Sequence, residues 1–373
     1  MTVKFDKRVT GINISGIRKM FDSAAPGSIN LGLGQPDFDT PAHIKNEAIK
    51  AIEEGFCGYT VNMGMPELRD AISRKFKKEN DLDYSPQEIL ITSGASEALH
   101  IALEALCGKG DEVLIPDPGF VSYVALSRLA DAKPVSVPLG PELRYDPEVL
   151  KGYINDKTRV IVLNSPSNPT GAVQTPEEMK AIAEIAEDRG VTVLSDEVYE
   201  HFIYDGKHDS PAKYSDNVIT INASSKTYAM TGWRIGYIAA RPEYTEQMLK
   251  VHQYVQACAC SISQRAALAA LTGPQDCVAA MRAEFKCRRD YLVGELHSMG
   301  VRCVNPKGAF YAFPYVGDEQ ATVMELMQKG VITTPGTAFG ENGKGYMRLC
   351  YATSMANLEK AVGIMKTVLK PSC

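Results

Sequence analysis

Four polar residues in the middle of the chain have side chains that could act together in catalysis. Asn168 follows one short apolar segment, and Lys226 follows another. Asp196 and Tyr199 come directly after a third such segment that lies between these two. In open α/β sheets, ligands bind just outside the carboxyl ends of the strands. If the three segments are strands of one sheet, the four side chains therefore meet at one edge of it.

A carboxylate, a phenol and an amine at one sheet edge favour one kind of chemistry. A buried lysine has a lowered pKa, which makes its amine a nucleophile toward carbonyl carbons. A buried carboxylate can keep a heteroaromatic nitrogen protonated, so that the ring accepts electrons. Taken singly, Asp196 could be only a helix N-cap and Lys226 only a solvated loop residue, so the prediction depends on the set.

Short apolar segments rich in β-branched residues alternate with amphipathic segments through the first two-thirds of the chain. The clearest predicted helix covers residues 176–189, with Thr175 as N-cap, Pro176 at its first position and Glu178 completing a capping box. Apolar strands without alternation are typical of sheets covered on both faces, so we expect a mainly parallel α/β sheet. The predicted strands are residues 88–92, 112–115, 160–163, 191–194, 218–221 and 235–239.

The last third of the chain has a different pattern. After Gln253 come long helical segments, then short strand patterns around residues 309–313 and 347–351, and then a final helix. This order predicts a smaller α+β domain. We find no internal repeat and no low-complexity linker, so the two parts should pack tightly.

Length and composition restrict the class of protein. The 373 residues, of which 45% are hydrophobic, suggest about two folded domains. With 40 basic and 45 acidic side chains the net charge is −5, which disfavours binding to nucleic acid. We find neither a membrane-spanning run nor a signal peptide. The nine cysteines contain no CxxC pair and the six histidines no metal motif, so we expect reduced, mostly buried thiols, no metal site and a cytoplasmic location.

The segment around Lys226, residues 224–237 (SSKTYAMTGWRIGY), closely resembles the lysine motif of class I aminotransferases, the fold-type I pyridoxal-phosphate enzymes. Six further blocks stand in that family's order, and the whole pattern is most similar to archaeal-type aspartate aminotransferases. Several blocks in one order make a chance match implausible. The six blocks are residues 31–41, 59–69, 164–173, 195–204, 306–314 and 346–353.

This resemblance implies a fold and a division into domains. The expected large domain, residues 46–275, carries a mainly parallel seven-stranded sheet covered by helices and binds the cofactor. The expected small domain is α+β and combines residues 1–45 with residues 276–373.

The resemblance also implies pyridoxal 5'-phosphate as the cofactor. Lys226 would bind it covalently as an imine and then move the proton between the substrate's Cα and the cofactor. Asp196 would pair with the pyridinium nitrogen. Tyr199 and Asn168 would hydrogen-bond to the 3-oxygen of the ring, and Phe120 would stack on the ring.

The cofactor's phosphate needs several donors. Arg234 stands eight residues after Lys226, where the family has its phosphate-binding arginine. Gly94, Ala95 and Ser96 open a predicted helix, whose N-terminus is suited to bind an anion.

One phosphate contact departs from the family, and another implies a second subunit. Ala223 stands where the family often has a serine, so Ser224 or Ser225 would replace it, and we assign Ser224. Tyr59 resembles the tyrosine that reaches the phosphate from the neighbouring subunit. The resemblance therefore implies a homodimer with its active sites at the interface.

The substrate's α-carboxylate would be bound by Arg348, because a guanidinium fork suits bidentate contact with a carboxylate. Gly34 and Asn168 would contact the same group. For a distal carboxylate of the substrate, Arg18 and His252 are the candidates.

The expected reaction is transfer of an amino group from an L-amino acid, preferably aspartate, to 2-oxoglutarate by a ping-pong mechanism. An aromatic or broad-specificity aminotransferase is the main alternative. A C–S lyase on the same fold would keep Lys226, Asp196 and Tyr199 and remains a further alternative.

Overall fold

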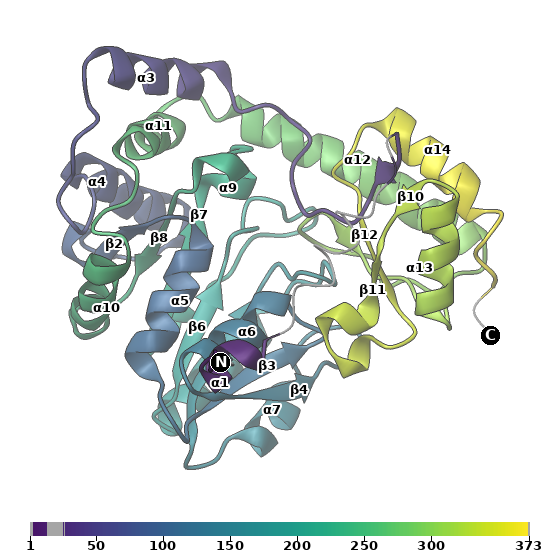
Figure 1. The fold of residues 1–373 in the computed structure, drawn as a ribbon, viewed down its shortest axis with the longest axis horizontal. Coiled ribbons are helices and arrows are strands. Elements are labelled where there is room, and N and C mark those ends of the chain that lie inside the picture. Colours follow the sequence, from purple (N-terminus) through teal and green to yellow (C-terminus); the bar gives the residue numbers. More distant parts are fainter. Residues whose placement is uncertain (1–2, 13–24, 26, 372–373) are drawn as a thin grey trace.

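A seven-stranded sheet forms the centre of the larger part of the computed structural model, which describes residues 3–12, 25 and 27–371 (Figure 1). The strand order is β2-β8-β7-β6-β5-β3-β4. Only β8 runs in the direction opposite to the other six strands, so the predicted mainly parallel sheet is confirmed. The strands are β2 (Ile89–Thr92), β3 (Glu112–Asp117), β4 (Lys133–Pro138), β5 (Thr158–Asn164), β6 (Thr192–Asp196), β7 (Val218–Ala223) and β8 (Gly236–Ala239).

Helices cover both faces of this sheet, because its central strands are apolar on both sides. On β5, Val160 and Val162 pack into one core with helices α5, α6 and α10, whereas Ile161 and Leu163 pack into another with α7 and α8. Successive side chains of a strand point to opposite faces, so this sequence needs cover on both. The helices are α5 (Ala95–Leu106), α6 (Val121–Leu129), α7 (Pro147–Tyr153), α8 (Pro176–Asp188) and α10 (Pro242–Val255).

The predicted strands and the predicted capped helix are confirmed, and their ends differ from the predicted ends by at most two residues. Helix α8 has its capping box between Thr175 and Glu178. Strand β4 is an addition that the sequence pattern did not indicate. It lies at the sheet edge and is partly exposed. It contains Pro134 and Pro138, which an edge strand tolerates but which interrupt the apolar run that predicts a strand.

The smaller part is α+β, as predicted (Figure 1). Its core packs α12 (Asp276–Ser298), α13 (Glu319–Gln328) and α14 (Met355–Met365) against short strands. One sheet has the order β11-β12-β9, and a second pairs β1 with β10. The strands are β1 (Ile29–Asn30), β9 (Tyr311–Ala312), β10 (Val331–Ile332), β11 (Thr334–Pro335) and β12 (Met347–Cys350).

The segment before residue 46 contacts both parts of the molecule. Strand β1 pairs with β10 of the smaller part, whereas the short helix α1 (Lys7–Thr10) lies against α6 of the larger part. Residue 46 itself lies within α3 (Ala42–Glu53), which packs on α11 (Ser261–Thr272) beside α4 (Pro66–Lys75).

The cysteines differ from expectation in one respect. The eight described cysteines are free, but only Cys303 and Cys350 are buried. The prediction of mostly buried thiols is therefore wrong, because the other six lie in loops and on partly exposed helix faces. Among the described helices, none combines the length and the apolar character that crossing a membrane requires.

Candidate active site

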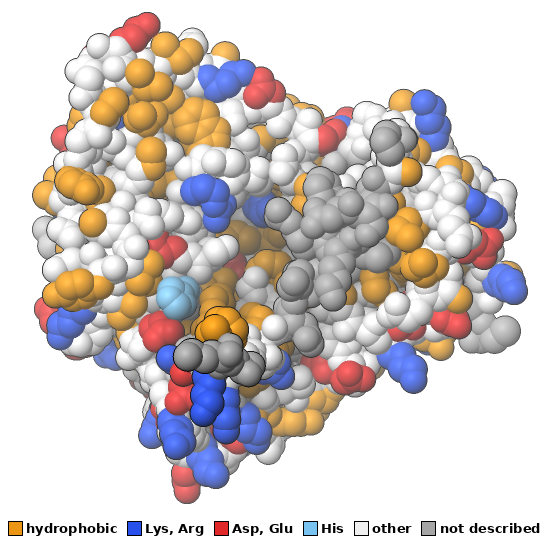
Figure 2. Space-filling view, viewed as in Figure 1, with side chains coloured by type: hydrophobic (Ala, Val, Ile, Leu, Met, Phe, Trp, Pro, Cys, Tyr) orange, Lys and Arg blue, Asp and Glu red, His pale blue; other side chains and the backbone are white. Residues whose placement is uncertain are grey.

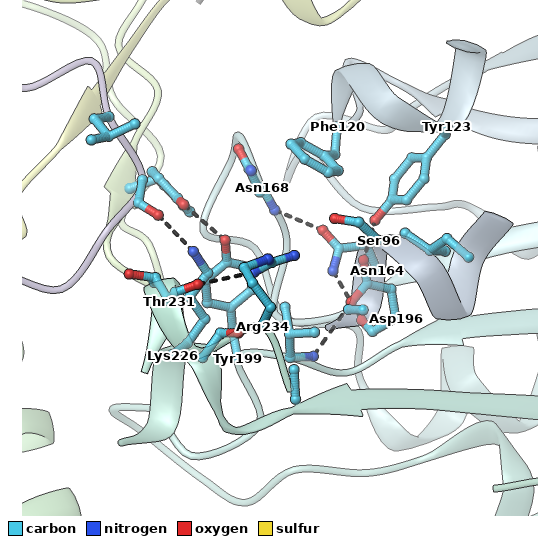
Figure 3. A pocket seen from close by; sticks show the side chains of 18 of the residues that line it. Ser96, Phe120, Tyr123, Asn164, Asn168, Asp196, Tyr199, Lys226, Thr231 and Arg234 are labelled. Carbon is cyan, nitrogen blue, oxygen red and sulfur yellow. Dashed lines mark hydrogen bonds between the residues drawn. The ribbon is translucent and has the colours of Figure 1, made fainter. Parts of the chain in front are cut away.

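A cavity of about 250 Å³ lies at the carboxyl ends of β5, β6 and β7, beside the N-terminus of α5 (Figure 3). This is the sheet edge that the sequence pattern indicated. Figure 2 shows the surface hollowed between the larger and smaller parts, with basic and hydrophobic side chains visible in the hollow. Ten of the predicted site residues line the cavity: Gly34, Ala95, Ser96, Phe120, Asn168, Asp196, Tyr199, Lys226, Arg234 and Arg348.

Three predicted site residues are not among those that line it. Ser225 lines the cavity whereas the buried Ser224 does not, so the choice of Ser224 is corrected to Ser225. Both residues lie in the short helix α9 (Ser224–Thr227), and only the turn of that helix decides which hydroxyl faces inward. Gly94 lies just behind the lining, as the N-cap of α5. Tyr59 is 91% exposed and borders a different hollow.

Lys226 is the amine of the site. Its Nζ atom donates a hydrogen bond to the carbonyl oxygen of Gly34, 2.6 Å away. Burial, together with the positive charges of Arg348 and Arg234, lowers the pKa of Lys226 to about 8. About a tenth of the amine is therefore neutral at pH 7, far more than for an exposed lysine, and can attack a carbonyl carbon.

Asp196 is the buried carboxylate of the site, at the end of β6. Its Oδ2 atom accepts a hydrogen bond from the hydroxyl of Tyr123 (2.8 Å), and its Oδ1 atom accepts one from the backbone N–H of Val198. Asn164 donates to its main-chain carbonyl and so fixes the same turn. Burial raises the pKa of Asp196 to about 6, although the bond from Tyr123 opposes this shift. A cationic ring nitrogen is the partner that would restore full ionisation.

The raised pKa of Asp196 predicts how the stability of the ligand-free protein depends on pH. An exposed aspartate has a pKa of about 3.9, so between about pH 4 and pH 6 the folded chain binds more protons than the unfolded chain. The Asp196 contribution is therefore fully present below pH 4 and is lost as pH rises through 6, at a cost of about 3 kcal/mol. Urea unfolding of the wild type and of Asp196→Asn at several pH values measures it. Equal pH slopes in the two proteins would contradict the assignment.

One buried nitrogen of Arg348 has no hydrogen-bond partner in the part of the chain that the structure describes. The side chain is 1% exposed. Its Nη1 donates a hydrogen bond to Oδ1 of Asn168 (2.8 Å), and its Nη2 donates one to the carbonyl oxygen of Gly32. Its Nε has no partner among the described residues. Its guanidinium carbon lies 4.8 Å from the ring centre of Tyr311 and 4.7 Å from that of Phe339. Within the described residues no carboxylate forms an ion pair with it. A buried, uncompensated guanidinium fork in a cavity is suited to receive a ligand carboxylate.

A second cationic position lies across the cavity, at the N-terminus of α5. Arg234 packs so closely on Gly94 that a Cβ atom there would lie 2.6 Å from its Nη2. Gly94 has a φ of +83°, so glycine is needed for its backbone as well as for the space. The helix N-terminus, the guanidinium and the hydroxyls of Ser96 and Ser225 form a site suited to a phosphate group.

Four polar lining residues that the sequence analysis did not assign to the site are Tyr123, Asn164, Thr231 and Tyr311. The hydroxyls of Tyr311 and Tyr199 are 2.8 Å apart. Tyr311 lies in the quoted block 306–314, but nothing in its spacing distinguishes it from the aromatic residues beside it. Its contact with Tyr199 crosses from the smaller part of the fold to the larger.

Of the two candidates for a distal carboxylate, Arg18 lies outside the described residues, and His252 does not line the cavity. His252 is fully buried on α10, where its Nδ1 lies 2.7 Å from Oε1 of Glu97 on α5. The interpretation of His252 as a substrate ligand is therefore wrong. His252 lies on the face of α10 that packs against α5, and the sequence alone could not show which face that is.

One group of three metal-ligand types occurs among the described residues: Glu197, Glu200 and His208. The ammonium of Lys75 forms an ion pair with Glu200, and Glu197 is bound by the His208 ring and by two serine hydroxyls. The two carboxylates of this cluster are thus bound by protein groups behind the turn that carries Asp196 and Tyr199, whereas Nδ1 of His208 has no partner among the described residues.

Comparison with known proteins gives one family for the whole chain. Residues 26–364 match the family model described as aminotransferase class I and II. A probable aspartate aminotransferase from Methanocaldococcus jannaschii is 47% identical over 372 residues, covering 97% of this chain and 99% of that protein. An aromatic-amino-acid aminotransferase 2 from Thermococcus litoralis is 42% identical over 379 residues, covering 97% of each. The solved aspartate aminotransferase from Thermus thermophilus with maleate has a TM-score of 0.95 at 35% identity and covers 99% of this chain and 100% of that one. The chain therefore belongs to the class I and II aminotransferase family.

Proposed function

We propose that this protein is a pyridoxal-phosphate-dependent aminotransferase that transfers an amino group from an L-amino acid, preferably aspartate, to 2-oxoglutarate by a ping-pong mechanism. One observation carries the proposal: a single cavity joins an amine whose pKa is lowered, a buried carboxylate and two separate cationic positions. A phosphorylated pyridine aldehyde and an amino acid together present the groups that complement this set.

The residues of the cavity fit the cofactor. The phosphate would be bound by the N-terminus of α5 and by Arg234, the ring nitrogen by Asp196, and the ring face by Phe120. Tyr199 and Asn168, which line the same cavity, would hydrogen-bond to the ring's 3-oxygen. When bound, pyridoxal phosphate supplies a carbonyl carbon for amines and a ring that accepts electrons.

Lys226 would hold the cofactor and move the proton at the substrate's Cα. Its lowered pKa allows it both to accept and to donate that proton near neutral pH, as general acid–base catalysis requires. In the ligand-free protein its Nζ donates a hydrogen bond to Gly34, which also lines the cavity.

Arg348 would bind the α-carboxylate of every substrate. We expect Arg348→Ala to raise KM about 100-fold for all amino donors alike, because about 3 kcal/mol of charge-assisted hydrogen bonding is lost. Steady-state kinetics with aspartate, tyrosine and alanine measures this effect, and Arg282→Ala, at an exposed position of α12, is the control. A loss confined to one donor would contradict the α-carboxylate role.

We propose aspartate as the preferred amino donor because the similar protein from Methanocaldococcus jannaschii is named a probable aspartate aminotransferase. The name of the Thermococcus litoralis relative favours an aromatic or broad-specificity enzyme as the second candidate. Values of kcat/KM for aspartate, tyrosine, phenylalanine and alanine with 2-oxoglutarate as acceptor discriminate between them. Release of ammonia or sulfide, without formation of an amino acid from 2-oxoglutarate, would instead indicate a lyase.

We further propose a cytoplasmic homodimer with its active sites at the subunit interface. Tyr59 and Tyr254 are 91% and 87% exposed, and Val61 and Val255 are more than half exposed. Tyr59 borders the same hollow as Gln256, the residue after Val255, and large exposed apolar side chains near one another favour an interaction surface. Tyr59 would reach the cofactor's phosphate in the second subunit. Sedimentation equilibrium should give twice the chain mass, and a monomeric mass at micromolar concentration would overturn the dimer.

We also propose that the chain divides into a large domain of residues 46–275 and a small domain that combines residues 1–45 with residues 276–373. The pairing of β1 with β10 supports it for the segment before residue 46. The contact of α1 with α6 and the packing of α3 on α11 indicate that the first 45 residues contact both domains.

A further inference from the structure

We infer that Tyr311 is a positioning residue for the proposed reaction. Its hydroxyl donates a hydrogen bond to the hydroxyl of Tyr199, which directs the hydrogen of Tyr199 toward the cofactor's 3-oxygen. This inference rests on the proposed function. The juxtaposition that carries it is the pair of phenol oxygens, 2.8 Å apart, inside the cavity.

Tyr311 is brought to Tyr199 by the packing of the small part of the fold on the large one. It lies on β9, opposite Cys350 of β12, whereas Tyr199 lies in the turn after β6. The two rings meet edge to face with their centres 5.7 Å apart, and both are buried, at 1% and 4% exposure. A buried hydroxyl needs a hydrogen-bond partner, and each of these is the other's.

The ring of Tyr311 is held from two other sides. The guanidinium of Arg348 lies over its face at 4.8 Å. Gly34 lies against its hydroxyl so closely that a Cβ atom at position 34 would overlap the oxygen. The glycine is thus required by the approach of Tyr311, in addition to the bond that its carbonyl accepts from Lys226.

The direction of the bond follows from the number of donors. A phenol has one hydrogen to donate and can accept further bonds. Because the hydrogen of Tyr199 is committed to the 3-oxygen, the hydrogen shared between the two phenols must come from Tyr311. Hydrogen bonds in such a chain strengthen one another, so Tyr199 becomes a better donor.

The pH midpoint of the bound cofactor's visible absorption band tests this inference. Donation to the 3-oxygen lowers this midpoint, so we expect Tyr311→Phe to raise it by about 0.5–1 unit, which corresponds to part of one hydrogen bond. Tyr199→Phe should raise it further. The double variant Tyr199→Phe/Tyr311→Phe should match Tyr199→Phe alone, because Tyr311 acts through Tyr199.

Tyr351→Phe is a matched control. Tyr351 is also a fully buried phenol of the small part, and its hydroxyl bonds to Tyr204 and to the carbonyl of Ala309, 3.3 Å from each, away from the cavity. Its removal deletes the same atom from the same core and should leave the midpoint unchanged. Equal shifts for Tyr311→Phe and Tyr351→Phe would overturn the inference, as would additive shifts in the double variant.

A second variant serves if Tyr311→Phe fails to fold. Gly34→Ala keeps the hydroxyl of Tyr311 but displaces it from Tyr199, so the pH midpoint should again rise. An unchanged midpoint would overturn the inference.

Failure of the proposed function would give a different result. A wild-type protein without any visible band after incubation with pyridoxal phosphate would contradict the cofactor itself. A wild-type band with a midpoint insensitive to position 311 would contradict only the role of Tyr311.

Discussion

Replacing Lys226 by Ala is expected to lower kcat/KM by at least about 10⁴-fold, because one residue both holds the cofactor and moves the substrate proton. The variant should also lose the visible absorption band that wild-type protein develops with pyridoxal phosphate. Steady-state kinetics and a spectrophotometric titration with the cofactor measure the two losses separately.

A second variant, a control variant and a rescue experiment test the assignment of Lys226. Lys226→Arg keeps a positive charge but cannot become a neutral nucleophile, so it should be as inactive as Lys226→Ala. Lys250→Ala removes an exposed lysine of α10 and should leave both readouts unchanged. Added methylamine should partly restore activity to Lys226→Ala, because it can carry the proton in place of the missing side chain. Activity of the Arg variant near the wild-type level would contradict the assignment.

Asp196→Asn is expected to have the second largest effect, with kcat lowered by at least about 100-fold. Asparagine has nearly the same shape and can still bond to Tyr123, but it carries no charge to keep a ring nitrogen protonated. The variant should therefore still bind pyridoxal phosphate through Lys226, and its visible band should persist while turnover falls. Absorbance together with steady-state kinetics separates binding from turnover.

The same substitution should stabilise the ligand-free protein. Burial of the charged Asp196 costs about 3 kcal/mol at neutral pH, and Asn avoids this cost. Opposite effects on stability and turnover are typical of a residue whose buried charge lowers stability but is needed for function. Asp216→Asn, at an exposed loop position, is the control for both measurements and should change neither. A ligand-free Asp196→Asn protein less stable than wild type at pH 7 would contradict the burial argument.

The polar residues at the strand ends were predictable because their signals are local. A buried parallel strand is a short apolar run, and the polar residues directly after it must reach the carboxyl edge of the sheet. Asn168, Asp196 and Lys226 could be placed in this way, and the cavity is indeed lined by all three. The edge strand β4 was missed for the opposite reason, since its two prolines and partial exposure remove the apolar run.

Contacts between distant segments could not be predicted in this way. Tyr311 meets Tyr199 across 112 residues of chain, and Tyr123 meets Asp196 across 73. Contacts between residues so far apart in sequence follow no helix or strand periodicity. The sequence also does not distinguish one tyrosine of an aromatic-rich segment from the aromatic residues beside it. His252 shows the same limit, because its neighbour Glu97 depends on how α10 packs against α5.

The sequence by itself determined the α/β class, the family resemblance and the types of groups at the sheet edge, because these depend on local pattern and on residue identity. The tertiary structure decided which groups share one cavity. It placed Ser225 rather than Ser224 at the lining, left the Nε atom of Arg348 without a partner among the described residues, and joined Tyr311 to Tyr199. The physical reason is that burial and hydrogen-bond partners are properties of the packed chain. The lowered pKa of Lys226 and the raised pKa of Asp196 likewise exist only once the fold removes water from both.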